Sequence, residues 1–123
     1  MALTFDKAHG TQTAVINTEH TLTTQSSAGI YQIVVNLKNM VAGDTLELRI
    51  YSKILTGDAQ DYLLYSFPGI ANAQGDAAAP GSSASGEVLF QCPPVVSAWE
   101  CVFTLKQVAG TGRSFDWRID QLS

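Results

Sequence analysis

The feature that most constrains this chain is an alternation of apolar and polar side chains with a period of two residues. In the segment 45–54, TLELRIYSKI, the even-numbered residues from Leu46 to Ile54 are apolar apart from Ser52, and the odd-numbered residues are polar or aromatic. Successive side chains of a strand point to opposite faces, so the pattern predicts a half-buried antiparallel strand. The segment 30–37, IYQIVVNL, is fairly apolar on both faces and predicts a central strand, separated from the first by a turn at Gly43 and Asp44.

Short segments rich in β-branched and aromatic residues predict seven further strands. They are 3–7, 13–17, 20–24, 61–67, 86–92, 99–108 and 114–122. No window of roughly 11 to 18 residues keeps the three-four spacing of an amphipathic helix, although the alanines of 68–79 allow one brief helical turn. We therefore expect an all-β fold: an antiparallel β-sandwich, jelly-roll-like, of about eight or nine short strands.

Two alternating runs flank a glycine-rich turn in the segment 102–119, VFTLKQVAGTGRSFDWRI. We expect a hairpin in which Gly110 and Gly112 supply positive φ angles and Arg113 reaches solvent or a carboxylate. The inward residues of the two strands are expected to face one another and to form the thickest part of the core. They are Trp99, Cys101, Phe103 and Leu105 on one strand, and Phe115, Trp117 and Ile119 on the other.

The length and composition predict one ordered domain over residues 1–123. With 123 residues, 46% hydrophobic and 15% charged, the chain can fill one core and is too apolar to be disordered. Residues 1–10 are a possible N-terminal arm. Residues 69–86, built from small residues, are expected to form a long surface loop that either contacts a partner or is simply flexible.

Charge and hydropathy exclude two classes of partner. The net charge is −4, and the 7 basic residues are scattered along the chain, whereas a nucleic-acid surface needs them clustered. No apolar run approaches the roughly 20 residues of a membrane span, and the start MALTFDKAHG has no secretory pattern, so we expect a soluble product that binds neither nucleic acid nor membrane. The two cysteines, Cys92 and Cys101, are either joined, if their strands pair, or two buried thiols.

No motif of known chemistry is found. His9 and His20 lie outside any triad-like pattern and are read as exposed or capping residues. Acidic pairs such as Asp58 with Asp61 or Asp116 with Asp120 are read as solvated surface. The loops GTGR and GSSASG have neither the lysine nor the helix of a phosphate-binding loop. We therefore predict no catalytic residue, no metal site and no cofactor.

Exposed aromatic side chains are the remaining candidates for binding. Tyr51 lies on the polar face of its strand, and Tyr62 and Tyr65 are next in interest. Such rings could stack on sugars, as in carbohydrate-binding sandwiches, or line a subunit interface. The enrichment of tyrosine at interfaces favours the second interpretation.

Two runs of the chain carry a resemblance to a family. They are TLTTQSSAGIYQIVVNLKNMVAGDTLELRIYSKI and CVFTLKQVAGTGRSFDWRI, with the patterns NM-x-x-GD-x-LELRI and TLKQ-x-AGTGR-x-F-x-W. Over about half its length the chain thus resembles a group of small uncharacterised proteins of tailed bacteriophages. The motifs mark a family but carry no chemistry.

The resemblance implies a capsid decoration or cement protein. Such proteins are compact β-sandwiches, often trimers, that bind across junctions of major capsid subunits, which places this chain on the capsid surface of the virion after synthesis in the host cytoplasm. The alternatives are a neck, tail or head-completion component, or a carbohydrate-binding module with Tyr51 or Trp99 as stacking rings. The expected partners are the major capsid protein and further copies of the chain, with a trimer favoured. The candidate interface residues are Leu3, Phe5, Tyr51, Tyr62, Tyr65 and Arg113.

Overall fold

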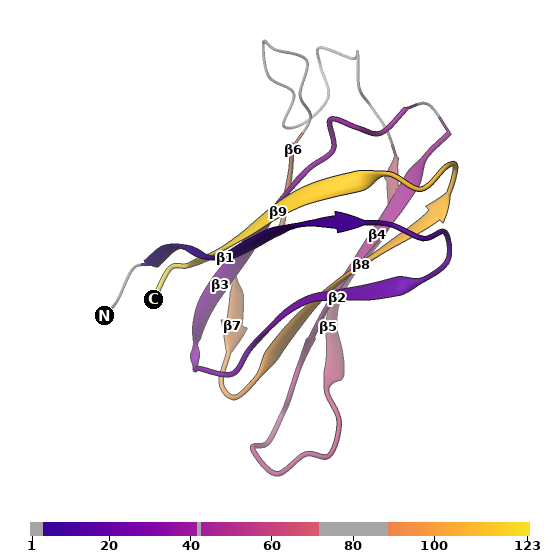
Figure 1. Cartoon of the computed structure of the whole chain (residues 1–123). Helices are drawn as coiled ribbons and strands as arrows, with labels where there is room; N and C mark the ends of the chain where they lie inside the picture. Colours follow the sequence, from indigo (N-terminus) through magenta and orange to yellow (C-terminus); the bar gives the residue numbers. More distant parts are fainter. Residues whose placement is uncertain (1–3, 42, 72–88) are drawn as a thin grey trace.

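The computed structural model describes residues 4–41, 43–71 and 89–123, and these form two antiparallel sheets packed face to face (Figure 1). The strands are β1 Thr4–Thr13, β2 Glu19–Gln25, β3 Gly29–Asn36, β4 Thr45–Ser52, β5 Tyr62–Ala71, β6 Leu89–Gln91, β7 Val95–Ser97, β8 Cys101–Ala109 and β9 Ser114–Gln121. The first sheet has the order β1-β9-β3-β6, with β7 also paired to β3, and the second has the order β2-β8-β4-β5. The all-β sandwich is confirmed.

The strand pairs are nested in sequence. β1 pairs with β9, β2 with β8, β3 with β6 and β7, and β4 with β5, all antiparallel. The chain is thus folded back on itself like one long hairpin, and the pairs β9 with β3 and β8 with β4 roll it into two sheets. If β6 and β7 are counted as one interrupted strand, this is the strand order of a jelly roll.

The core lies between the sheets and is filled by alternate side chains of their central strands. In β3, Tyr31, Ile33 and Val35 are at most 1% exposed, as expected for a central strand. In β4 the inward positions from Leu46 to Ser52 are buried as the alternation predicts, but Ile54 lies beyond the strand and is 67% exposed. Phe103 and Leu105 of β8 meet Phe115 and Ile119 of β9 within the same buried cluster.

The expected strand boundaries are wrong in three places. Residues 13–17 are not a strand: β1 continues to Thr13, and the chain then turns at Asn17, where φ is 63°. The three-residue strand β7 was not expected, since its length carries no readable period. Trp99 precedes β8 and is 44% exposed, so it is not part of the core.

The expected hairpin in 102–119 is also wrong. β8 belongs to the second sheet and β9 to the first, so the connection 110–113 is an arch that crosses the sandwich. Gly110 has the positive φ expected, 90°, but Gly112 does not. A Cβ on Gly112 would instead collide with the carbonyl oxygen of Ala14, because the Ala14 amide is bound to the Arg113 carbonyl at 2.8 Å.

Two predicted segments fall only partly within the described residues. Residues 4–10 of the expected N-terminal arm are not an extension but part of β1, which pairs with β9; Leu3 lies outside the described residues. Residues 69–71 of the expected surface loop belong to β5, and residues 72–86 lie outside the described part of the chain.

The close approach at Gly112 predicts a sensitive position. Gly112→Ala should lower the free energy of unfolding by about 2 kcal/mol, because the added methyl group meets backbone that cannot move aside. Gly57→Ala is the matched control: no atom lies within 4 Å of its added Cβ, and we expect a change within about 0.5 kcal/mol. Urea denaturation of both variants measures the difference, and equal stabilities would contradict it.

Candidate functional site

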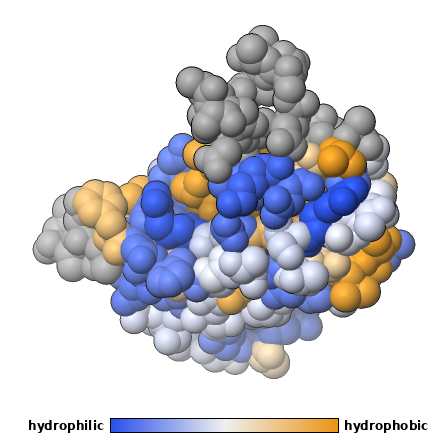
Figure 2. Space-filling model, turned by 45° about the horizontal axis from the view of Figure 1, so that its top comes forward, coloured by the Kyte–Doolittle hydropathy of each residue, from blue (hydrophilic) through white to orange (hydrophobic). Residues whose placement is uncertain are grey.

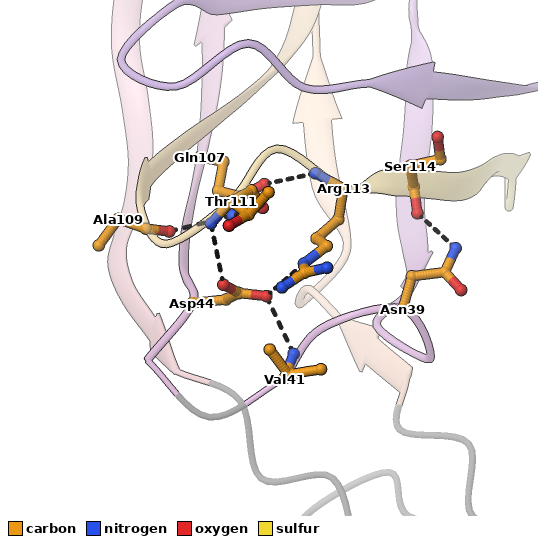
Figure 3. Close-up of polar contacts among 8 residues, drawn as sticks. All are labelled: Asn39, Val41, Asp44, Gln107, Ala109, Thr111, Arg113 and Ser114. Carbon is orange, nitrogen blue, oxygen red and sulfur yellow. Dashed lines mark hydrogen bonds and ion pairs between the residues drawn. The ribbon is translucent and has the colours of Figure 1, made fainter.

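A buried carboxylate joins two of the connections that cross between the sheets, β3–β4 and β8–β9 (Figure 3). Asp44, at the end of the β3–β4 connection, is only 2% exposed. Its side chain accepts hydrogen bonds from the Val41 amide at 2.9 Å, the Thr111 amide at 3.3 Å and the Arg113 Nε at 2.9 Å. Thr111 and Arg113 belong to the β8–β9 arch. Asp44 therefore fastens one crossing segment to the other.

The fully buried amide of Gln107 supports the same arch from inside. Its Nε2 donates to the carbonyl oxygens of Ala109 at 3.0 Å and Thr111 at 2.7 Å, and its Oε1 accepts from the Arg113 amide at 3.0 Å. Asn39 adds a bond to the carbonyl oxygen of Ser114 at 2.8 Å (Figure 3). Each side chain satisfies backbone groups that the turn leaves unpaired, so the cluster holds the shape of the fold.

The electrostatics of Asp44 follow from this geometry. Burial by itself raises the pKa of the Asp44 carboxyl, but the hydrogen bonds from Val41, Arg113 and Thr111 and the charge of Arg113 outweigh it and hold the pKa below its ordinary value. The carboxylate stays ionised and bound to Arg113. Its role is structural.

A second polar network covers the outer face of the second sheet. Glu19 of β2 accepts hydrogen bonds from the hydroxyls of Tyr51 at 2.8 Å and Thr104 at 2.6 Å, and it pairs with Arg49 at 3.3 Å. Burial raises the pKa of Glu19, but these hydrogen bonds and the charge of Arg49 together lower the pKa by more than burial raises it. The pKa of Glu19 therefore lies below its ordinary value. Tyr51, a sequence-predicted interface residue, is therefore tied into its own sheet through its hydroxyl.

The other predicted interface residues are not brought together. Phe5 lies on β1 of the first sheet and is 70% exposed, whereas Tyr62 and Tyr65 are exposed on β5 of the second sheet. Arg113 lies in the arch and reaches the carboxylate of Asp44, one of the two outcomes expected for it. The predicted residues thus mark several surfaces and no single site.

The histidines and one acidic pair are placed as follows. His9 meets Asp6 at 2.8 Å with both side chains well exposed, and His20 accepts the Val15 amide at 3.1 Å in an exposed turn. Asp116 is exposed and accepts from Thr11 at 2.6 Å. Asp120, expected to be solvated, is instead buried, because it accepts the Asp6 amide at 2.7 Å in the bulge of β1.

The two cysteines are buried free thiols. Cys101 begins β8 in the second sheet and Cys92 follows β6 of the first, so their strands do not pair. Burial, with Cys92 and Asp61 nearby, raises the pKa of the Cys101 thiol to about 12. A thiol that stays protonated is a poor nucleophile, so this residue acts as a packing group.

Sequence reasoning missed a surface at one end of the sandwich. It consists of large apolar side chains from the β4–β5 loop, β5 and the segment around β7, and we call it the apolar end surface. Its members are Ile54, Leu55, Tyr62, Leu63, Leu64, Val96 and Trp99. The signal was present in β5, where the run Tyr62 to Tyr65 breaks the alternation with four consecutive large side chains. Its composition by itself is typical of an ordinary strand.

The described residues line at least two surface pockets. One, of about 210 Å³, is lined mainly by residues of the apolar end surface. The other, of about 240 Å³, lies on the first sheet between Leu89, Trp117 and Arg118. The face shown in Figure 2 is hydrophilic over much of its middle, and its apolar residues lie toward its margins.

Comparisons with models of known protein families, with curated proteins and with solved structures find no match. Within residues 4–41, 43–71 and 89–123, no helix is long and apolar enough to cross a membrane. In the same residues, no three acidic, histidine or cysteine side chains are grouped so as to hold a metal ion.

The buried Asp44 predicts a specific acid sensitivity. Its pKa is lowered in the folded protein, so the stability it contributes is present above its ordinary value near 3.8 and is lost as the pH falls through the lower, folded value. Asp44→Asn should reduce the free energy of unfolding at pH 7 by about 3 kcal/mol, because Arg113 loses its partner. The gap between the two proteins should narrow as the pH falls below about 4. If urea denaturation showed the same difference in stability between the wild-type protein and Asp44→Asn from pH 7 down to pH 2, this role of Asp44 would be ruled out.

Proposed function

We propose that this chain is a non-enzymatic structural protein of a tailed-phage virion that decorates and stabilises the capsid by binding across junctions of major capsid subunits. The family resemblance of the runs 21–54 and 101–119 supports the phage context. The jelly roll supports a structural role more weakly, because one fold serves many functions. The observation that carries the proposal is that β1 is an edge strand whose bulge exposes Phe5.

β1 is an edge strand of the first sheet, with no described strand on its outer side. Thr4 pairs with Gln121 and Ala8 with Ile119, so the residues between Thr4 and Ala8 bulge away from β9, and Asp6 takes a φ of 55°. This bulge leaves Phe5 70% exposed. From Ala8 to Thr13 the register with β9 is regular, so this part of the edge, beside the bulge that exposes Phe5, is suited to receiving a segment of another protein.

Rigidity is the second property that the proposal requires. The Asp44 cluster ties the β3–β4 and β8–β9 connections together, and the Glu19 network ties β2, β8 and β4 across their outer face. A protein held in this way loses little conformational entropy when it docks. Several weak contacts made by a multivalent assembly then add through their effective concentration.

A carbohydrate-binding module is the second candidate, and one observation favours it. Trp99 and Tyr62 are both about half exposed, and Tyr62 lines the pocket of about 210 Å³. Such rings can stack on a sugar. A glycan array probed with the purified chain tests this function, and an array without hits removes it.

Copy number tests the main proposal. Purified protein added to undecorated capsids of a phage that encodes this chain should bind in hundreds of copies, counted by cryo-electron microscopy. About 6 or 12 copies at one vertex would assign it to the neck or tail instead, because closed rings at the portal axis have cyclic symmetry. No binding to any virion particle would overturn the proposal.

Substitution of Phe5 tests whether the β1 edge is the surface that attaches to the capsid. Phe5→Ala should weaken capsid binding about tenfold, since a central aromatic anchor commonly contributes 1–2 kcal/mol or more. Val15→Ala is the matched control, because Val15 is 60% exposed near the opposite end of the same strand. Equal binding by the two variants would show that the β1 edge is not the attachment surface.

A further inference from the structure

The apolar end surface is continuous, although its residues come from three separate segments. Ile54 of the β4–β5 loop, Tyr62, Leu63 and Leu64 of β5, and Val96 of β7 line one pocket of about 210 Å³. Trp99 is linked to the same loop, because its indole nitrogen donates to the carbonyl oxygen of Ile54 at 3.3 Å. Leu55 follows Ile54 and is 64% exposed. The surface therefore combines a hollow with protruding side chains.

The loop that carries Ile54 and Leu55 is held in a fixed conformation. The carboxylate of Asp58 accepts the amides of Ile54 at 3.1 Å and Leu55 at 2.8 Å, and the Asp58 amide donates to the carbonyl oxygen of Leu55 at 3.1 Å. The backbone groups of this turn are satisfied locally. The two apolar side chains are thus presented outward by a preorganised turn, which lowers the entropic cost of docking.

The exposed apolar area is too large to be incidental. At roughly 150 to 250 Å² for a whole large residue, the exposed fractions of the seven residues, backbone included, correspond to roughly 600 to 950 Å². The largest apolar patch of a typical monomer is about 300–600 Å². A standard interface buries about 800 Å² on each partner. The surface thus has the area of one half of such an interface.

The charges around the surface fit an identical partner. None of the seven side chains is charged. Lys53, which also lines the pocket, is paired with Glu100 at 3.8 Å, and the carboxylate of Asp58 is bound to the amides of Ile54 and Leu55. Two copies of a chain with net charge −4 repel one another, so self-association requires a contact that brings no like charges face to face. The seven apolar side chains meet that condition, and the charged groups of Lys53 and Asp58 beside them already have partners within the chain.

We propose that the apolar end surface docks against the same surface of a second copy of this chain, about a two-fold axis. In such an isologous contact each copy supplies both the hollow and the protruding side chain, so one pocket per copy is sufficient. The contact is made by side chains and not by a continuous β-ladder. β5 is an edge strand, but it bulges where Ile50 pairs with Tyr65 and Tyr51 pairs with Leu63, which interrupts a regular edge.

The inference goes beyond capsid attachment and differs from the trimer that the family resemblance implies. A face that binds itself is saturated by one partner, so it makes a dimer. A trimer would need this surface to meet a different one on its neighbour.

Mass measurement of the full-length chain tests the inference. Sedimentation equilibrium at micromolar concentrations should give a dimer. Leu55→Asp and Val96→Asp should each weaken dimerisation by about 100-fold, because each buries unpaired charge against its symmetry mate. Both side chains are at least 64% exposed, so the fold should be kept, which circular dichroism and the melting temperature verify. Val15→Asp is the control with equal charge at an exposed apolar position elsewhere, and it should leave the dimer unchanged.

Three outcomes would overturn the inference: a wild-type monomer at about 100 times that concentration, a trimer, or a dimer that resists both substitutions at the end surface. Equal weakening by Val15→Asp would also overturn it, because the effect would then come from net charge. Capsid binding separates the two proposals. A dimer that binds no capsid leaves this inference standing and removes the proposed function, whereas a wild-type monomer that decorates capsids does the reverse.

Discussion

The fold depends on one buried carboxylate at one of the places where the chain changes sheets. The connection from β3 to β4 and the arch from β8 to β9 both cross the sandwich there, and Asp44 binds amides of both together with the guanidinium of Arg113. Burying a carboxylate is costly unless donors replace its water, and here three donors do so. The position of β4 relative to β9, and with it the alignment of the two inner faces, is fixed by this cluster.

The two docking surfaces inferred for this protein lie on opposite edges of the sandwich. β1 lies at the edge of the first sheet nearest β2, whereas β5 lies at the far edge of the second sheet, where Phe67 packs edge-on against Phe90 of β6 with ring centroids 5.2 Å apart. One surface can therefore be occupied without blocking the other. A chain that pairs with its own copy through β5 and attaches through β1 presents two attachment edges per dimer. Two linked weak contacts bind more tightly than either one alone, because the second contact forms at a high effective concentration.

Polar side chains and apolar side chains serve different purposes in this molecule. The strongest described hydrogen-bond clusters, around Asp44 and Glu19, face inward or across strands and brace the sandwich. Most of the large exposed apolar side chains belong to the apolar end surface, and Phe5 is exposed on β1. Bracing reduces the motion that docking would otherwise have to freeze, so the two features support the same mode of action.

The sequence by itself determined the fold class, the strands around Tyr31 to Val35 and Leu46 to Ile50, and the core side chains that these strands contribute, because alternation is a local property that each segment carries alone. Only the tertiary structure decided which strands pair. The run through Gly110 has the local chemistry of a hairpin turn, yet it is an arch, because Gln107 and Asp44 bind its backbone from inside the fold. The burial of Asp44 and the union of Ile54, Leu63 and Val96 in one surface were likewise beyond the sequence, since each depends on partners far away in the chain.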